Sequence, residues 1–176
     1  MLKKKTVELD HWIRAIAGGD TDALASLYQE TSPSVYAYAL SALKNSHDAE
    51  DVMQDCYVAV YTSSAVYRAS GKPMAWIITI ARNLCLHRLR ANRYRAELSD
   101  EDWGELLPDR TELTMEDRVI LRACMQILGD EERQILTLHT IGGLKHREIA
   151  DLLEMPLSTV LSKYRRALKK LRRVLE

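Results

Sequence analysis

The residues best suited to chemistry lie near the C-terminus, on a segment with helical periodicity. Between Ser158 and Val174 the chain carries seven Lys or Arg residues and no Asp or Glu. Its apolar residues fall on one face of a helix, namely Val160, Tyr164, Ala167, Leu168, Leu171 and Leu175. The opposite face is basic and hydroxyl-bearing. Arg can bond guanine edges, and Ser or Thr can bond phosphates or bases, so the pattern predicts DNA binding. An ordinary solvated face is the alternative, although solvated faces usually mix both charge signs.

The preceding residues predict a partner for this helix. Residues 145–153 form a short amphipathic segment, and Pro156 in the tight connection prevents that helix from continuing. Ser158 then caps the basic helix. A short helix, a sharp turn and a second helix with small and basic residues at its start are typical of a helix-turn-helix. The polar residues of its first turns are Ser158, Thr159, Ser162, Lys163, Arg165 and Arg166.

A second basic surface is predicted on a helix that Pro73 opens and that continues to about Tyr94. Its predicted buried stripe is Ile77, Ile80, Ala81 and Leu84. The remaining face offers positive charge and an amide for phosphates and base edges, through Arg82, Asn83, Arg88 and Arg90. In the preceding loop, Tyr67 offers a stacking face and Arg68 a phosphate partner. Trp76, beside the apolar stripe, is expected to be a core residue.

A third surface, on a helix from about residue 46 to residue 61, is acidic. Asp51, Gln54 and Asp55 share one face, with Asp48 one turn earlier, whereas Val52, Cys56 and Val60 form a core face. A face of carboxylates and an amide can pair with arginines on a partner helix. From the spacing alone, an ordinary solvated acidic face explains the pattern equally well.

The elements that position these residues are predicted to be helices throughout. The fold class is all-α, with two small helical domains joined by an acidic flexible linker. The first domain covers residues 1–97, and the linker covers residues 98–116, with seven acidic residues against one basic. The second domain covers residues 117–176. Nine helices are expected: 7–17, 21–30, 33–43 (capped by Ser32), 47–61 (capped by Ser46), 73–94, one led by Thr114 and closed by Gly129, one from Asp130 to Gly142, 145–153 and 158–175.

Composition excludes several other classes. The 176 residues include 25 basic and 25 acidic side chains, so the formal net charge is zero. No apolar run is long enough to span a bilayer, and membrane insertion is not expected. Cys56, Cys85 and Cys124 are expected to pack as small apolar residues, with a redox sensor as the weaker alternative. Neither the five histidines nor the cysteines show metal-ligand or nucleophile spacing. We therefore expect a cytoplasmic protein that is not an enzyme and has no metal or cofactor.

Three segments together resemble one family. The Glu148-Ile149-Ala150 step, the turn Pro156, Thr159-Val160 and Arg166-Ala167 look like the promoter-reading domain of bacterial sigma factors. Residues 46–57 resemble the helix by which sigma factors grip core RNA polymerase, and residues 76–83 resemble the helix that faces the −10 promoter element. The resemblance covers about residues 20–173. The short length implies the extracytoplasmic-function (ECF) class of the sigma-70 superfamily, which keeps only these two domains.

This resemblance implies roles for the residues above. The acidic face (Asp48, Asp51, Gln54, Asp55) would contact the β′ clamp helices of core RNA polymerase, and the β flap is a further implied partner. The second surface and the loop would read the −10 element, through Tyr67, Arg68, Arg82, Asn83, Arg88 and Arg90. The helix-turn-helix would read the −35 element through Ser158, Thr159, Ser162, Lys163, Arg165 and Arg166. An anti-sigma factor is implied as a regulator.

Three positions depart from the family pattern. Leu161 stands where many relatives carry a basic residue, Lys145 where many have a small hydroxyl residue, and Tyr57 where Phe is common. The −35 sequence is therefore left open. Two other functions remain as alternatives: a stand-alone regulator that binds operator DNA without polymerase, and a protein-interaction module.

Overall fold

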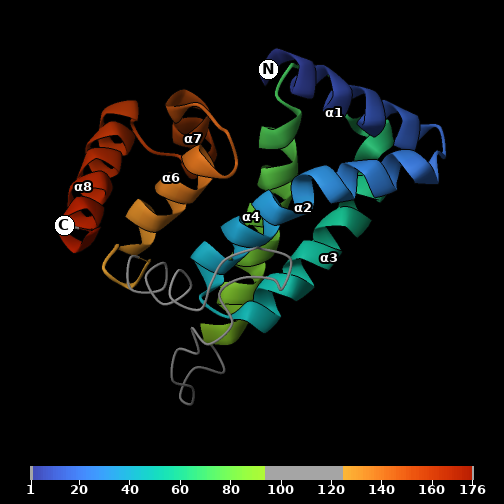
Figure 1. Ribbon diagram of the computed structural model, residues 1–176. Coiled ribbons are helices and arrows are strands. Elements are labelled where there is room, and N and C mark those ends of the chain that lie inside the picture. Colours follow the sequence, from blue (N-terminus) through green and yellow to red (C-terminus); the bar gives the residue numbers. More distant parts are fainter. Residues whose placement is uncertain (1, 94–124, 176) are drawn as a thin grey trace.

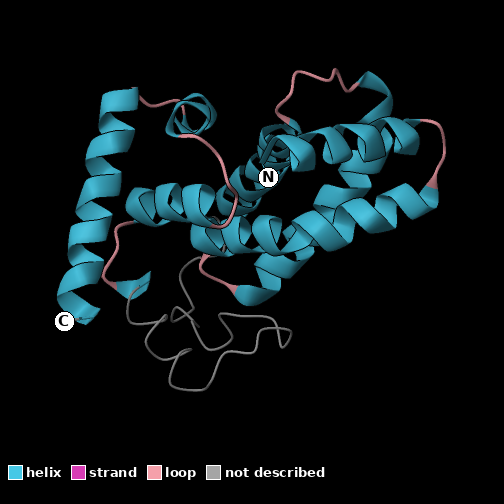
Figure 2. Cartoon of the chain, turned by 45° about the horizontal axis from the view of Figure 1, so that its top comes forward, coloured by secondary structure: helices cyan, strands magenta, loops and turns pink. Residues whose placement is uncertain are grey.

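The computed structural model describes residues 2–93 and 125–175, and these are built from helices (Figures 1 and 2). Within these two ranges there is no β-strand. The predicted acidic linker, Cys124 and most of the helix predicted before Gly129 lie outside the described residues. The all-α fold class is confirmed for these residues.

The first lobe contains α1 (Leu2–Ala17), α2 (Thr21–Leu43), α3 (Ser46–Ser63), the short 3₁₀ helix η1 (Ser64–Val66) and α4 (Pro73–Arg93). Side-chain caps fix where two of these helices begin. The Asp20 carboxylate accepts hydrogen bonds from the backbone N–H groups of Asp22 and Ala23 at the start of α2. The Asn45 amide oxygen accepts one from Asp48 at the start of α3. The prediction that Ser46 caps α3 is therefore wrong by one residue.

The two helices predicted on either side of Ser32-Pro33 are one continuous helix, α2. Pro33 lacks the N–H that would bond the preceding turn, and proline inside a helix costs about 3 kcal/mol. The side chains around it explain why the helix continues, since Leu27, Thr31 and Val35 are one turn apart and all fully buried. Breaking α2 at Pro33 would expose this stripe. Burial therefore outweighs the local preference for a helix start.

The second lobe contains α6 (Asp130–Thr140), α7 (His146–Leu153) and α8 (Leu157–Leu175). Between α6 and α7 the chain turns at Gly142 and Gly143. A Cβ on Gly142 would lie 2.7 Å from the Leu138 carbonyl oxygen, and Gly143 has a left-handed φ of 67°. Both positions therefore need glycine, and the turn brings α7 back against α6.

A buried arginine holds the entry to α6. Arg133 is 4% exposed, and its guanidinium donates hydrogen bonds to the Met125 and Leu128 carbonyl oxygens at 3.0 and 2.8 Å. It also pairs with Asp130 at 3.2 Å. A hydrogen-bonded cation tolerates such burial because its donors are satisfied. Arg133 thus ties the segment before α6 to the helix.

The two lobes pack directly against each other. In Figure 1, α6 lies alongside α2, while α8 stands at the outer edge, away from the first lobe. Buried residues of both lobes form one continuous apolar cluster, with Val35 and Ile77 from the first and Leu138 and Ile149 from the second. The two lobes therefore share one core in this structure.

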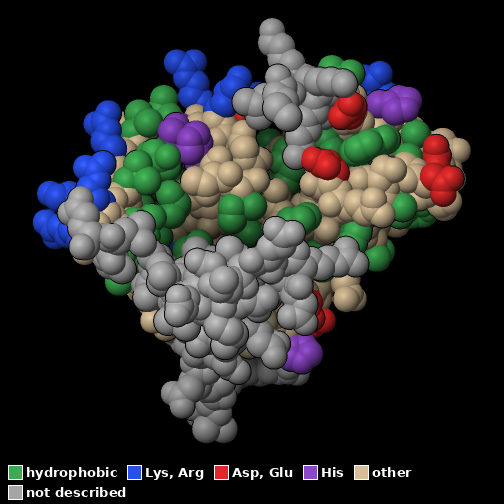
Figure 3. Space-filling model, viewed as in Figure 1, with side chains coloured by type: hydrophobic (Ala, Val, Ile, Leu, Met, Phe, Trp, Pro, Cys, Tyr) green, Lys and Arg blue, Asp and Glu red, His purple; other side chains and the backbone are tan. Residues whose placement is uncertain are grey.

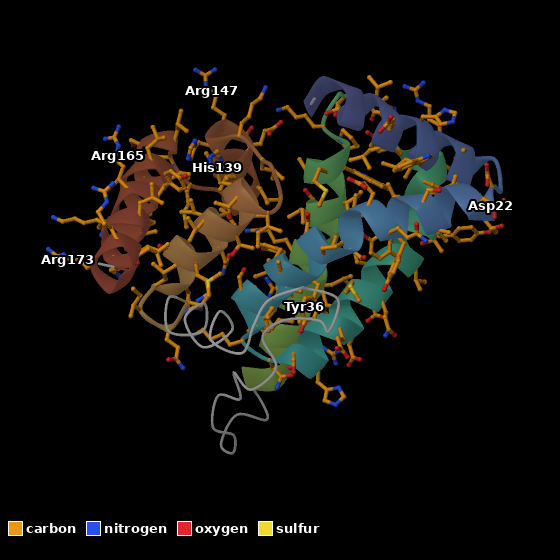
Figure 4. The ribbon with its side chains drawn as sticks, viewed as in Figure 1. Asp22, Tyr36, His139, Arg147, Arg165 and Arg173 are labelled. Atoms are coloured by element: carbon orange, nitrogen blue, oxygen red, sulfur yellow. The ribbon has the colours of Figure 1, made fainter. Side chains whose placement is uncertain are left out.

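We predict that Arg133→Ala destabilises the protein by about 2–3 kcal/mol, because it leaves buried carbonyl groups without their donor. Urea or thermal unfolding followed by circular dichroism measures this loss. Arg147→Ala, at an exposed arginine of α7 (Figure 4), is the matched control and should stay within about 0.5 kcal/mol of the wild type. Equal effects of the two variants would contradict the anchoring role of Arg133.

Candidate nucleic-acid interface

The outer face of α8 presents the predicted basic surface to solvent. Arg165 and Arg173 point away from the rest of the molecule in Figure 4, and Lys and Arg side chains gather along this edge in Figure 3. Of the predicted set, Ser158, Ser162, Arg165 and Arg166 are exposed, whereas Thr159 and Lys163 are half-buried. The Lys163 ammonium pairs with the Glu131 carboxylate of α6. The structure thus brings the six predicted residues together on one helix. Besides the pair of Lys163 with α6, the Arg166 guanidinium donates a hydrogen bond to the Ser162 hydroxyl at 3.4 Å.

The opposite face of α8 is anchored on α6 and α7. Val160 and Ala167 are fully buried, and Tyr164 and Leu171 pack beside them, as the periodicity predicts. Leu168 differs from the prediction, since it is 43% exposed. A half-buried ion pair, with Lys170 Nζ 2.6 Å from Glu132 Oε2, joins α8 to the start of α6. The orientation of the basic face is therefore set by packing beneath it.

Two histidines meet beneath α8. The rings of His139 (α6) and His146 (α7) stack with centroids 4.2 Å apart, and Tyr164 of α8 contacts both edge-on. His139 Nδ1 donates to the Leu144 carbonyl oxygen at 2.9 Å. His146 Nε2 is buried and has no hydrogen-bond partner among the described residues. Burial, with a contribution from the neighbouring His139, lowers the pKa of His146. The sequence places the two histidines seven residues apart across the glycine turn, which favours surface or capping roles. The turn instead brings the two rings together as a half-buried stack.

The predicted surface on α4 is only partly free. Asn83 and Arg90 are exposed, but Arg82 Nη1 lies 3.3 Å from Glu154 Oε1 at the end of α7. Arg88 turns toward α3, where its Nη2 lies 2.7 Å from Asp51 Oδ2 and its Nε lies 3.5 Å from Asp48 Oδ1. The structure thus joins Arg88, which we had grouped with the −10 residues, to two residues that we had grouped with the polymerase face.

The buried stripe of α4 also differs from the prediction. Ile77 and Ala81 are fully buried as expected, but Ile78 and Cys85 complete the stripe, while Ile80 and Leu84 are only partly buried. The helix is covered by α2 as well as α3, so its apolar face is wider than one periodic stripe.

In the loop before α4, the structure holds Tyr67 and leaves Arg68 exposed. The Tyr67 hydroxyl donates a hydrogen bond to Asp10 of α1, and its ring lies against Trp76 with centroids 4.7 Å apart. Burial, together with the bond to Asp10, raises the pKa of Tyr67. Trp76 packs partly buried against the core, as predicted. Tyr67 is therefore positioned by α1, a contact that spacing could not reveal.

The acidic face of α3 is exposed and wider than predicted. Asp51, Gln54 and Asp55 are exposed and Asp48 is half-buried, while Val52, Cys56 and Val60 are buried as expected. Sequence reasoning missed Val58 and Tyr61, which are 65% and 47% exposed. They lie four and seven residues beyond Gln54, so they extend the same helical face with apolar surface. The signal available in the sequence was Val58, an apolar residue that lies outside the periodic core stripe of α3.

Two cysteines behave as core residues. Cys56 and Cys85 are buried, and burial raises the pKa of each thiol to about 12. Their thiolate forms are therefore suppressed, as expected for packing groups. In the part of the chain that the structure covers, no helix has the length and apolar character needed to cross a membrane.

Comparison with known protein families identifies the family region to which each lobe corresponds. Residues 27–95 match the family model for Sigma-70 region 2, and residues 118–171 match that for Sigma-70, region 4. The first match includes α3, the loop and α4, and the second includes α6, α7 and most of α8. The two lobes are thus the region 2 and region 4 domains of a factor of the sigma-70 type.

Relatives define the class more narrowly. The chain is 30% identical to the ECF RNA polymerase sigma factor SigK of Mycobacterium ulcerans, over 96% of this chain and 94% of that protein. It is 29% identical to SigK of Mycobacterium tuberculosis over the same shares. The chain therefore belongs to the ECF RNA polymerase sigma factors.

Solved structures share the fold. CnrH, in complex with the cytosolic domain of CnrY, matches with a TM-score of 0.66 and 20% identity, over 96% of this chain and 97% of that chain. RpoE from Bartonella quintana, in complex with the anti-sigma factor NepR, matches with a TM-score of 0.70 and 20% identity, over 86% of this chain and 95% of that chain.

We predict that the protein loses stability as the pH falls below 6.5, the ordinary pKa of His146. Because the pKa of His146 is lowered in the folded state, the unfolded state binds more protons below pH 6.5. The stability that the neutral ring provides is therefore complete above pH 6.5 and is lost as the pH falls toward the lowered pKa. His146→Phe keeps a ring in the stack, and should reduce the drop in melting temperature between pH 7.5 and pH 5.5. The control is His47→Asn, at an exposed histidine of α3. An unchanged drop in the Phe variant would contradict this role of His146.

Proposed function

We propose that this sigma factor holds core RNA polymerase through α3, reads the −10 element through α4 and its preceding loop, and reads the −35 element through α8. The proposed polymerase- and −10-binding domain is residues 1–97, and the −35-binding domain is residues 117–176. The observation that carries the proposal is the outer face of α8: an exposed row of hydroxyl and guanidinium groups on a helix whose other face is anchored in the core.

The polymerase contact is proposed for the exposed face of α3. Asp51, Gln54 and Asp55 supply polar groups, and Val58 and Tyr61 supply apolar area on the same face. An interface of this type combines an apolar anchor with polar groups that set orientation. A helix rich in arginine, such as the β′ clamp helices, fits this combination. Arg88, which stays in the proposed −10 set, pairs with Asp51 and Asp48 and so also holds these two carboxylates in place.

The −10 contact is proposed for α4 and the loop before it. The residues are Tyr67, Arg68, Arg82, Asn83, Arg88 and Arg90. Strand opening costs a few kcal/mol per unstacked step, and a stacking platform beside positive charge offsets that cost. Tyr67, already fixed by Asp10 and Trp76, presents its ring without further ordering.

Membership of the family supports proposals for the cellular location and for further partners. The protein assists initiation without chemistry of its own, and we propose that it is not an enzyme and acts in the cytoplasm. The β flap of the polymerase is the proposed partner of the second lobe. An anti-sigma factor is the proposed regulator, because the similar RpoE chain was solved with the anti-sigma factor NepR.

We predict that Gln54→Arg and Val58→Glu each abolish assembly with core RNA polymerase and leave the fold intact. The first places positive charge against a basic partner, and the second buries a charge in an apolar contact. Co-elution with core enzyme on size exclusion measures assembly, and circular dichroism checks the fold. The control is Thr62→Ala on the exposed end of the same helix. If both variants co-elute like the wild type, the docking face lies elsewhere.

We predict that Arg166→Ala and Ser162→Ala weaken recognition of the −35 element, and that Asn83→Ala weakens recognition of the −10 element. Each specific base contact contributes about 1–3 kcal/mol. Run-off transcription by reconstituted holoenzyme on a genomic library reports promoter choice and strength together. Arg147→Ala serves as the control, since this exposed arginine lies on α7 rather than on α8. Unchanged promoter choice in all three variants would refute these assignments. Sequence-specific DNA binding by the protein without core polymerase would favour the stand-alone regulator.

A further inference from the structure

One apolar side chain near the start of α8 does not belong to the core. Leu161 is half-buried, and among the described residues it is part of neither of the two apolar clusters. Val160, the residue before it, is fully buried. Because successive residues of a helix are about 100° apart, the packing of Val160 turns Leu161 toward the outer face of α8. Leu161 therefore needs an explanation other than core packing.

The neighbours of Leu161 on the helix surface are polar and face solvent. Ser158 lies three residues before it and Arg165 four residues after it, so both share its side of α8. Both are exposed, and Arg165 points away from the rest of the molecule in Figure 4. Figure 3 shows apolar side chains beside the Lys and Arg side chains of this edge. Leu161 thus lies within the surface proposed to read the −35 element.

The position of Leu161 along α8 is that of a base-reading residue. In a helix-turn-helix, the residues that contact base edges lie near the N-terminus of the second helix. Leu161 is in the second turn of α8, which begins at Leu157. Leu168, on the same face, is 43% exposed, but it lies about 10 Å further along the helix axis. Leu161 is therefore placed for base contact, whereas Leu168 lies beyond the base-reading turns.

A leucine side chain can recognise only an apolar feature of DNA. It neutralises no phosphate and forms no hydrogen bond, so it adds nothing to the electrostatic part of the affinity. In the major groove, the apolar group that marks a base pair is the C5-methyl group of thymine. Contact between leucine and this methyl group removes both from water, and the burial of one methyl group corresponds to about a 4-fold change in affinity.

We propose that Leu161 reads a thymine of the −35 element through the C5-methyl group of that base. Ser158 and Arg165, on either side of the leucine, bond phosphates or base edges, and Leu161 selects an A·T pair at one position. This assignment rests on the proposed −35 role of α8. It adds the identity of one base pair that the −35 element must contain.

The test compares thymine with deoxyuridine, which lacks only the C5-methyl group. Holoenzyme is reconstituted from the full chain and core RNA polymerase, and the probe is a double-stranded promoter fragment recovered by run-off transcription from the genomic library. Each thymine of its −35 region, on either strand, is replaced in turn, and competition binding gives the ratio of the two affinities. We expect one replacement to weaken wild-type binding about 3–5-fold and to have no effect on the binding of Leu161→Ala.

Two further variants separate this contact from a structural role of Leu161. Leu161→Met keeps an apolar side chain of similar volume, so it should keep the preference for thymine. Leu168→Ala makes the same change beyond the base-reading turns and should keep the full wild-type preference. Thermal melting followed by circular dichroism checks that each variant folds, because alanine and methionine both favour helix.

The contrary results overturn the assignment in distinguishable ways. If no replacement weakens wild-type binding, or if Leu161→Ala keeps the preference, Leu161 does not read a methyl group. If Leu161→Ala and Leu168→Ala both weaken co-elution with core polymerase and leave the thymine preference unchanged, the two leucines form a protein contact instead. If Arg166→Ala and Ser162→Ala leave promoter choice unchanged, the −35 role of α8 fails, and the assignment of Leu161 fails with it.

Discussion

The structure depends on the burial of the second half of α2 on every side. Six of the seven residues from 35 to 41 are buried, namely Val35, Tyr36, Tyr38, Ala39, Leu40 and Ser41. A helix with buried residues on every face must be covered by other helices on all sides. Helices α3 and α4 cover it within the first lobe, and α6 covers it from the second. This need keeps α2 continuous through Pro33 and brings the two lobes together.

Once α6 is fixed on α2, the positions of the other surfaces follow. The glycine turn returns α7 against α6, and α8 packs over both through Val160, Ala167 and Tyr164. The basic face of α8 must then point outward, while the acidic edge of α7 faces α4. A single packing contact therefore leaves the basic face of α8 at the surface and places Arg82 of α4 against the second lobe.

Charged side chains that are buried or paired within the protein position its helices and take part in no reaction. Arg133 bonds backbone carbonyls before α6, Glu132 pairs with Lys170, and Arg88 holds Asp51. Buried or half-buried charges of this type are costly unless their partners are in place. They therefore specify how helices meet, and they leave other polar residues of α3, α4 and α8 exposed at the surface.

The sequence by itself determined the helical class and the basic face of α8, because helical periodicity and capping are local properties. Both sigma regions were identified from the resemblance of short segments to the family. It also identified Cys56 and Val52 as core residues, since each recurs on an apolar stripe. Only the tertiary structure decided which polar side chains are exposed and which pair with another helix. Arg82 and Arg88 look alike in sequence, yet one pairs with Glu154 and the other with Asp51. The stack of His139 on His146 and the hold of Asp10 on Tyr67 likewise join separate elements. Such pairings depend on how helices pack, and packing is set by burial summed over the whole chain, which no local pattern records.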